Sequence, residues 1–308
     1  MGTPERSALS KLNPAPLNPP AQMNSAASVN PVSSTRIEHA SLNAWPALHQ
    51  VLHDGWLLRF CGGFTKRANS VSVLTTGQQT MEARIAFCEA LYEQHGQTTV
   101  FRLTSDGPEP GLDALLAARG YAVLDRTDVL TANAEALLER NQLERNQLER
   151  DQLERDQSER DQSERDQPIA LSREAWLAHY TRLSGSPASA TRLHDLLLAS
   201  IRLPCLFGVT MQADTVVACG LAVCEADLVG LFDIVTSAEH RSQGHGERLT
   251  AGLIAWGAAQ GARTAYLQVL EANAPAQRLY HRLGFGARYR YWYRTAPCRS
   301  ETRADTRD

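Results

Sequence analysis

The 308-residue chain lacks the features that mark membrane, secreted and zinc-binding proteins. No apolar run reaches the length of a membrane span, and the N-terminus has no apolar core of a signal peptide. No C-x-x-C pair occurs among the six cysteines, which stand at positions 61, 88, 205, 219, 224 and 298. Because several of them fall inside apolar runs, they indicate buried reduced thiols more than disulfides or a metal site. These absences predict a cytoplasmic protein that holds no metal.

Strong charge of one sign is also missing, since the formal net charge is −3. No overall field therefore attracts nucleic acid or a membrane surface. One local exception is the run RYRYWYR at Arg288–Arg294, in which cations and aromatics are interleaved. We expect a strand with its aromatics inward and its arginines outward. Binding of nucleic acid through stacking and phosphate contacts is the alternative.

Two segments carry no pattern that could build a core. Residues 1–34 are rich in Pro, Ser, Ala and Asn, so we expect disorder there and an ordered chain from near Arg36. At 138–167 a pentapeptide of the type LERNQ, LERDQ or SERDQ occurs six times. Each copy would rotate a helix by roughly 140°, so its leucines spiral and a coiled coil is not expected. An exposed linker is favoured, and a dimerising or partner-binding helix is the alternative.

The most informative stretch is RSQGHG at 241–246. It lies between an apolar run that ends near Val235 and a helical pattern that begins at Glu247. A strand, a Gly-bearing loop and a helix start together form an anion cradle, because free backbone N–H groups and the helix dipole attract phosphate oxygens. Gly244 and Gly246 allow the main chain to approach a ligand closely. The stretch therefore predicts a ligand that carries a pyrophosphate.

Two common phosphate loops are excluded by the residues around these glycines. No Lys follows either glycine, as a Walker A loop requires, and the third glycine of a dinucleotide fingerprint is replaced by Leu249. The spacing R-x-x-G-x-G instead resembles the acetyl-CoA loop of the GNAT N-acetyltransferases. Downstream, Asn273–Phe285 fits the later GNAT motif N-x-x-A-x-x-L-Y-x-x-x-G-F at every fixed position, and the strand Thr264–Leu270 lies between the two motifs.

The resemblance implies acetyl-CoA as co-substrate and a set of residues that bind it. In GNAT enzymes the pantetheine lies along a strand and the pyrophosphate lies on the loop. The resemblance implies that Tyr280 is the general acid beside the departing sulfur and that Asn273 contacts the CoA chain at a helix start, where it also suits an N-cap. The other implied CoA contacts are Ile234, Val235 and Thr236 on the strand and Arg241, Gln243, Gly244, His245 and Gly246 in the loop.

The candidate for the general base is Asp233, the lone carboxylate of an apolar strand next to the implied CoA positions. A buried carboxylate in this place can accept a proton directly or through water, or it can serve as a structural acceptor. His240 and His245 are alternatives, although both are expected at the phosphate end. Glu225 and Asp227 look like turn residues and rank lower.

Residues 36–130 predict a second GNAT-like half. The expected strands are Trp56–Phe60, Ser70–Leu74, Thr98–Leu103 and one that ends near Leu130, and the expected helices are 79–94 and Leu112–Arg119. The pattern around Leu112–Tyr121 echoes the Leu-Tyr and Gly-Phe positions of the C-terminal motif, but this half has no R-x-x-G-x-G loop. After the repeat the chain predicts helices at Arg173–Leu183 and Thr191–Ala199 and then strands at Cys205–Thr210, Thr215–Cys224 and Asp227–Val235.

The expected fold is therefore α/β, a mixed central sheet flanked by helices and duplicated along the chain. The predicted division is a disordered segment 1–34, a degenerate GNAT-like domain 35–134, a linker 135–168, a catalytic GNAT domain 169–296 and a tail 297–308. We expect acetyl transfer to a primary amine, of a small molecule or an amino acid, by direct attack in a ternary complex. A non-catalytic acyl-CoA sensor, and an acetyltransferase for protein or nucleic-acid-associated substrates, are the alternatives. The oligomeric state stays open, as monomer or homodimer, and we expect the N-terminal half to close the acceptor pocket.

Overall fold

The computed structural model describes residues 32–140, 142–143 and 168–297. Most of the predicted disordered segment, the pentapeptide repeat and the tail lie outside these residues. Order was expected near Arg36, but the first helix, α1 (Ser34–Ala44), begins slightly earlier because the Ser33 hydroxyl accepts from the Arg36 N–H. In the described part of the chain no helix is long and apolar enough to cross a membrane.

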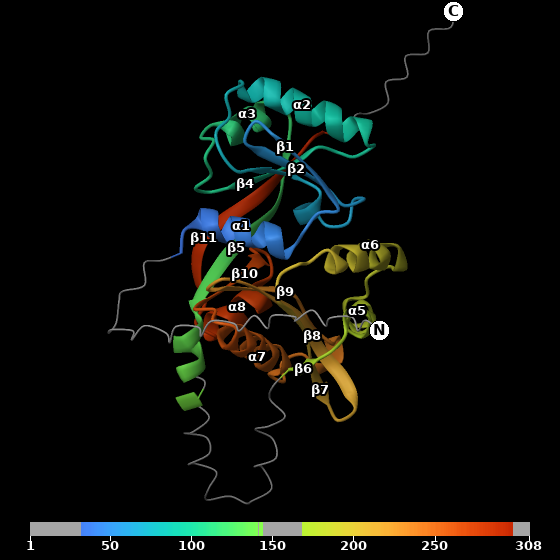
Figure 1. The fold of residues 1–308 in the computed structure, drawn as a ribbon, viewed down its shortest axis with the longest axis vertical. Coiled ribbons are helices and arrows are strands. Elements are labelled where there is room, and N and C mark those ends of the chain that lie inside the picture. The colour runs from blue at the N-terminus through green and yellow to red at the C-terminus, as the bar shows by residue number, and fades with distance from the viewer. Residues whose placement is uncertain (1–31, 141, 144–167, 298–308) are drawn as a thin grey trace, which may run out of the picture. The chain divides into compact units, whose positions relative to one another are not determined.

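The described strands form one sheet in the order β1-β2-β3-β4-β11-β5-β10-β9-β8-β7-β6 (Figure 1). Most neighbours are antiparallel, whereas β3 with β4 and β10 with β9 are parallel. Mixed α/β architecture with a mixed sheet is thus confirmed. The strands are β1 (His49–His53), β2 (Trp56–Phe60), β3 (Val71–Val73), β4 (Val100–Thr104), β5 (Ala122–Asn133), β6 (Ile169–Ala170), β7 (Cys205–Gln212), β8 (Thr215–Glu225), β9 (Leu228–Thr236), β10 (Thr264–Leu270) and β11 (Gly286–Thr295).

The two halves of the chain exchange strands within this sheet. The last strand, β11, lies between β4 and β5, and it pairs antiparallel with both. The partner of β5 on its other side is β10, with Leu130 opposite Leu267. The domain boundaries predicted from the sequence stay predictions. In the sheet, strands of one half lie directly beside strands of the other half.

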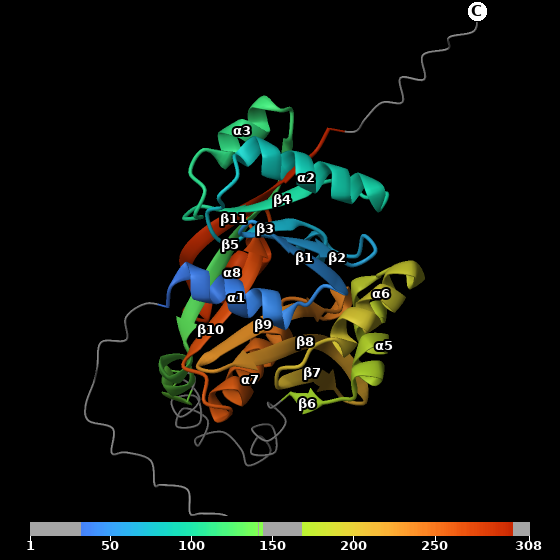
Figure 2. The same cartoon turned by 45° about the horizontal axis from the view of Figure 1, so that its top comes forward.

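Helices cover both faces of the sheet. They are α1, α2 (Met81–Gln94), α3 (Leu112–Ala118), α5 (Arg173–Ser184), α6 (Ala188–Ala199), α7 (His245–Ala259) and α8 (Ala274–Arg282), with a 3-10 turn η1 (Lys66–Ala68). One core joins α1, α5 and α6 to the strands, and α1 crosses the middle strands in Figures 1 and 2. The opposite face is covered by α7 and α8 and, at β2 to β4, by α2 and α3. Val129 and Leu130 illustrate the division, because they are adjacent in β5 and enter opposite cores.

The elements predicted from the sequence are confirmed, with ends shifted by a few residues. The strands Trp56–Phe60 and Thr264–Leu270 have the predicted bounds. The helix expected from Glu247 begins at His245, and the one expected from Thr191 begins at Ala188. Neither α1 nor β1 was predicted from the sequence.

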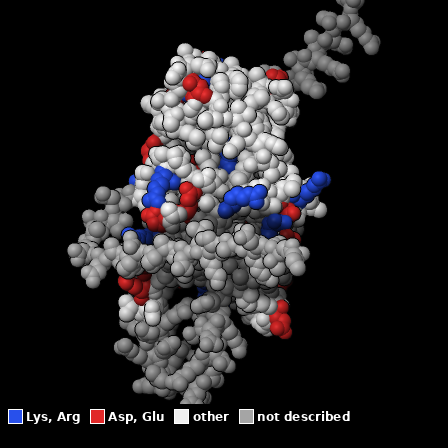
Figure 3. Space-filling model, viewed as in Figure 1, with Lys and Arg blue, Asp and Glu red and all other residues white. Residues whose placement is uncertain are grey.

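The alternation predicted for Arg288–Arg294 is confirmed in β11. Tyr289, Tyr291 and Tyr293 are buried. The arginines of the other face are engaged by carboxylates, since Arg290 lies 2.8 Å from Asp128 and Arg294 lies 2.8 Å from Asp113. On the face drawn in Figure 3, the described cations and anions are interspersed, without a broad area of one sign.

The described cysteines are free thiols, and all but the half-buried Cys205 are buried. Burial raises the pKa of the Cys224 thiol to about 11 and that of the Cys88 thiol to about 12, so both stay protonated at neutral pH. This confirms the reduced state expected of these five residues, while Cys298 lies outside the described part.

Candidate active site

A bulge in β9 sets the orientation of Asp233. The pairing of β8 with β9 shifts register between Cys219 and Leu221, and Asp233 lies at the irregularity with a left-handed φ of 50°. Successive side chains of a regular strand point to opposite faces. Here Phe232 enters the core under α1, α5 and α6, and the next residue, Asp233, contacts side chains of α5 and α6. The bulge therefore directs both side chains to the same face.

The same strand has an edge that no other strand pairs with in the described part of the chain. β9 pairs with β10 only from Leu228 to Leu231, although β9 continues to Thr236 on its β8 side. Beyond Leu231, the backbone N–H and C=O groups of β9 that face away from β8 are thus not paired with β10. Ile234, Val235 and Thr236 lie on this free edge and are half-buried. An extended ligand chain can pair with such an edge as an added strand.

The predicted phosphate loop follows that edge. Gly244 is the N-cap of α7 with φ of 79°, and because glycine has no side chain to cap the helix, the first N–H groups of α7 stay directed to the loop. Arg241, Gln243 and Gly244 are exposed, and His245 is buried beneath them. A Cβ on Gly246 would lie 3.2 Å from Thr236 Oγ1, which shows how closely α7 packs on the end of β9.

His245 is held neutral in this loop. Its Nδ1 lies 2.7 Å from Arg248 Nη2, and its ring centroid is 6.1 Å from that of His240. Burial lowers the pKa of His245, and the charges of Arg248 and His240 lower it further. Both histidines therefore lie together at the predicted phosphate loop.

Asn273 and Tyr280 belong to α8 on the other face of the sheet. The Asn273 side chain accepts from the Ala276 N–H at 3.3 Å, which confirms the N-cap geometry expected there. Tyr280 is 7% exposed and packs at 5.9 Å from Phe285 in the core that Ile234 also contacts. Burial raises the pKa of Tyr280 to about 12, so its hydroxyl keeps its proton at neutral pH. Tyr280 and Asp233 thus lie on opposite faces of the sheet.

Asp233 has two partners that sequence reasoning missed. His194 Nε2 in α6 lies 2.8 Å from Asp233 Oδ2, and the His194 side chain is 3% exposed. The Tyr180 hydroxyl in α5 donates to Asp233 Oδ1 at 3.4 Å. Burial, together with the charge of Asp233, raises the pKa of Tyr180. The carboxylate thus contacts two side chains of the helices that cover this face, and its close contact with His194 Nε2 is an ion-pair contact without hydrogen-bond geometry.

The other carboxylates considered as bases are engaged elsewhere. Asp227 forms an ion pair with Arg36 of α1. Glu225 accepts from Asn43 at 3.0 Å. Both link α1 to the strands and lie at the far ends of β8 and β9 from the phosphate loop.

Side chains of the N-terminal half reach the Asp233–His194 pair. Trp45 stacks on Phe232, with ring centroids 5.8 Å apart, and lies 5.7 Å from the His194 ring. Phe64 lies 5.0 Å from the same histidine ring. The Arg67 guanidinium lies 4.9 Å from the centroid of the Trp45 ring. Residues from both halves therefore surround the candidate base.

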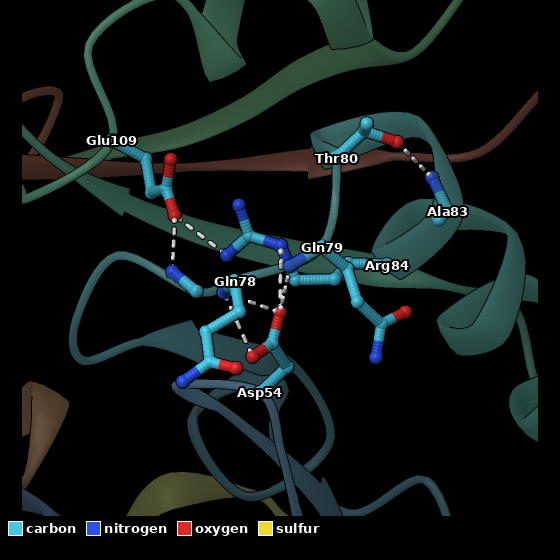
Figure 4. A network of polar contacts seen from close by, with 8 residues as sticks. Asp54, Gln78, Gln79, Thr80, Ala83, Arg84 and Glu109 are labelled. Atoms are coloured by element: carbon cyan, nitrogen blue, oxygen red, sulfur yellow. Dashed lines mark hydrogen bonds and ion pairs between the residues drawn. The ribbon is translucent and has the colours of Figure 1, made fainter.

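The N-terminal half has a matching strand–loop–helix, but the loop before its helix is occupied by the chain's own carboxylates. β3, α2 and the parallel strand β4 repeat the order of β9, α7 and β10. The Asp54 carboxylate accepts from the N–H groups of Gln78 and Gln79 at 2.8 to 3.0 Å (Figure 4). Glu109 accepts from the Gly77 N–H and from Arg84. Internal carboxylates thus take the place that an external phosphate would need.

The loop around Asp54 gives a pH-dependent prediction. N–H donation from Gln78, and then from Gln79, lowers the pKa of Asp54 in the folded state. Because the pKa is lower in the folded state, the ionised carboxylate stabilises the fold at pH values above its unfolded pKa of about 3.9. This stabilisation is lost as the pH falls through the pKa of the folded state. Asp54→Asn is therefore expected to lower the melting temperature at pH 7 and to match the wild type progressively as pH approaches 3.

The control for this prediction is Asp195→Asn, which removes an exposed pair with Arg173. Exposed pairs contribute about 0 to 1 kcal/mol, so thermal unfolding of this variant should follow the wild type across the same pH series. A deficit of Asp54→Asn that is as large at pH 3 as at pH 7 would contradict the electrostatic account of the loop.

Within the described residues no cluster of three or more His, Cys, Asp or Glu side chains is placed to hold a metal ion.

Comparisons with known proteins agree with this arrangement. A family model described as "Probable histone acetyltransferase Rv0428c C-terminal" matches residues 33–294. The chain is 27% identical over 263 residues to "Uncharacterized N-acetyltransferase YobR" of Bacillus subtilis (strain 168), a match that covers 84% of this chain and 97% of that protein.

Solved structures share the fold over both halves. A GCN5-related N-acetyltransferase from Kribbella flavida superimposes with a TM-score of 0.57 at 15% identity, covering 86% of this chain and 95% of that one. A tandem GNAT protein from the clavulanic acid biosynthesis pathway gives 0.52 at 14% identity, covering 85% and 88%. Since the family model spans the chain from α1 to β11, this protein belongs to the GNAT family of N-acetyltransferases.

Proposed function

We propose that the protein transfers the acetyl group of acetyl-CoA to a primary amine of a small molecule, by direct attack in a ternary complex. The observation that carries this proposal is the free edge of β9, with Asp233 on one face of the sheet and Tyr280 on the other. A thioester laid along that edge would have a proton acceptor on the amine side and a proton donor on the sulfur side. Family membership supports acetyl transfer itself, and the acceptor and the residue roles are proposed.

The chain offers a continuous binding track for acetyl-CoA. Backbone groups of Ile234, Val235 and Thr236 would pair with the pantetheine amides, because this edge has no strand partner. The start of α7 would hold the pyrophosphate, with its N–H groups as donors and the positive end of its dipole nearby. The loop residues that would line this end are Arg241, Gln243, Gly244, His245 and Gly246, and Asn273 would contact the CoA chain at the start of α8.

Asp233 and Tyr280 would manage the protons of the reaction. Asp233, held by His194 and Tyr180, would accept a proton from the attacking amine as the bond from nitrogen to the acetyl carbon forms. Tyr280 would donate its hydroxyl proton to the CoA sulfur as the carbon–sulfur bond breaks, and would then regain a proton from water. Its raised pKa of about 12 keeps that proton in place at neutral pH until the sulfur departs.

A small acceptor is favoured over a protein lysine. The matching family model carries the word histone in its description, which names a protein substrate for the protein it is based on. In this chain, however, Trp45, Phe64 and Arg67 of the N-terminal half pack around the Asp233–His194 pair. Aromatic side chains from two halves of the chain suit an enclosed small ligand better than an extended polypeptide.

Tyr280→Phe tests the catalytic role directly. We expect kcat for acetylation of a panel of primary amines to fall by about 10- to 100-fold, because the variant loses general-acid assistance to the leaving thiol. The Kd for acetyl-CoA, measured by calorimetry, should not change, since the ring itself remains. Thiol release in steady-state assays gives the rates.

The matched control is Tyr121→Phe, which removes a buried hydroxyl that donates to Glu89 in the N-terminal half. Its turnover should equal that of the wild type. Wild-type rates in Tyr280→Phe would remove the acid role. Acetyl-CoA binding by the wild type without turnover of any amine would favour the acyl-CoA sensor instead.

A further inference from the structure

Arg67 presents a half-buried cation beside the candidate base. It belongs to the 3-10 turn η1, and its guanidinium lies 4.9 Å from the Trp45 ring centroid and 5.8 Å from that of Phe232. Stacking on aromatic rings uses the flat face of a guanidinium. The N–H donors lie in its plane and stay available for an acceptor.

Those donors have no carboxylate or carbonyl partner in the part of the chain that the structure describes. The ring contacts are the only interactions found there for the Arg67 side chain. Other cations of the N-terminal half differ. Arg84 is paired with Glu109 and Arg102 with Glu38, and the neighbouring Lys66 lies 2.8 Å from Asp125.

A second cation lies behind Arg67. Arg59 is 2% exposed and donates only to backbone carbonyls, among them that of Arg67 at 2.6 Å. Burial, with a smaller contribution from the charge of Arg67, lowers the pKa of Arg59 to about 10, and the group remains a cation at neutral pH. Two neighbouring guanidinium groups without a carboxylate leave a local excess of positive charge, which favours an anion at this place.

The excess positive charge adjoins the site that would receive the amine. Phe232, under the Arg67 guanidinium, immediately precedes Asp233 in β9, and the bulge places both side chains on one face. The Trp45 ring that Arg67 contacts is also 5.7 Å from the His194 ring. This region thus contains Asp233, a proton acceptor for an amine, and Arg67, a cation whose N–H groups donate no hydrogen bond within the described residues.

We propose that Arg67 binds a carboxylate of the acceptor, so that the substrate is a small amine that also carries a carboxylate, as an amino acid does. This inference rests on the proposed acetyl transfer to a small amine. The planar fork of a guanidinium matches a carboxylate with two parallel hydrogen bonds, and its stacking on Trp45 and Phe232 fixes the direction of the fork. Arg67 would then determine specificity, while the proton transfers stay with Asp233 and Tyr280.

The test uses the full-length protein and matched pairs of acceptors. Each amino acid is compared with the amine that lacks its carboxylate: phenylalanine with phenethylamine, leucine with isoamylamine, and lysine with cadaverine. Phosphoethanolamine is added as an amine that carries a phosphate instead of a carboxylate. In the wild type the carboxylated members should have the higher kcat/KM. In Arg67→Gln the KM of the carboxylated members should rise roughly 10- to 100-fold, the effect of losing charge-assisted hydrogen bonds, while the KM of their partners stays unchanged.

Two further variants separate recognition from folding. Arg67→Lys keeps the charge without the fork, so its KM for carboxylated amines should lie between those of the wild type and Arg67→Gln. Lys66→Gln removes the adjacent, exposed cation and should match the wild type. Melting temperature and the Kd for acetyl-CoA are recorded for every variant, and both should stay at wild-type values if Arg67 acts on the acceptor.

Several outcomes would overturn the inference. They are equal use of the paired amines by the wild type, a KM increase in Arg67→Gln that is the same for both members of a pair, preference for the phosphorylated amine, and acetyl-CoA binding without transfer to any carboxylated member. Failure of the proposed function is recognised separately, because the wild type would then not bind acetyl-CoA in the calorimeter.

Discussion

Gly244→Glu is expected to raise the Kd for acetyl-CoA at least about 100-fold, a loss of about 2.7 kcal/mol. Gly244 is the N-cap of α7 with φ of 79°, so any side chain there adopts a strained left-handed conformation. A glutamate would also place a negative charge at the helix start, where the pyrophosphate is proposed to bind, and would repel it. Calorimetric titration of acetyl-CoA into the purified protein measures the change.

The control lies at the other end of the same helix. Gly261 follows α7 with φ of 95°, and a Cβ there would have no heavy atom within 4 Å. Gly261→Glu therefore imposes similar backbone strain far from the loop, and its Kd should equal that of the wild type. Equal binding by the two variants would show that the loop is not the pyrophosphate site.

The same titration gives the stoichiometry of acetyl-CoA binding, and so shows whether one half of the chain or both halves bind it. We expect one molecule per chain, because Asp54 and Glu109 already bind the backbone N–H groups of the loop before α2 in the N-terminal half. A stoichiometry of two would contradict that interpretation of the N-terminal loop.

Asp233→Asn is expected to lower kcat/KM for the amine by about 10²- to 10⁴-fold, the range of a lost general base. Asparagine is the informative replacement because it tolerates a positive φ, which is 50° at this position, and keeps the side-chain shape. The Tyr180 hydroxyl can still donate to the amide oxygen. The Kd for acetyl-CoA should stay unchanged, since the strand edge uses backbone groups.

Asp227→Asn is the matched control, because Asp227 immediately precedes β9 and forms an ion pair with Arg36, with about a third of its side chain exposed to solvent. Its kcat/KM should equal that of the wild type. If Asp233→Asn kept wild-type kcat/KM, the carboxylate would be a structural acceptor and the base would have to be sought elsewhere.

Local patterns explain what could be predicted from the sequence. The loop at 241–246, the strand Thr264–Leu270 and the N-cap Asn273 are each defined by a few consecutive residues, so their spacing is visible without a fold. By contrast, β1 has mostly exposed residues and shows no alternation, and the buried face of α1 contains small residues such as Ala40 and Ala44. Weak periodicity of this kind gives no signal for an element.

The residues around Asp233 were not predictable from motifs because they are distant in sequence. His194 comes from α6, and Trp45 and Arg67 come from the opposite half of the chain. One signal existed for His194, which shares the buried face of α6 with Leu197 and Leu198 at helical spacing. A polar residue in a core-facing position points to a specific partner, but the sequence does not name that partner.

The place of β11 in the sheet has a consequence for synthesis on the ribosome. The N-terminal half emerges first, yet the gap between its strands β4 and β5 is filled by β11, which ends at Thr295. Pairing of such distant segments is slow, and unpaired strand edges are prone to aggregate. The nascent chain must therefore hold two open strand edges until β11 has been translated. A stop codon that removed only the last strand would leave both halves incomplete at once.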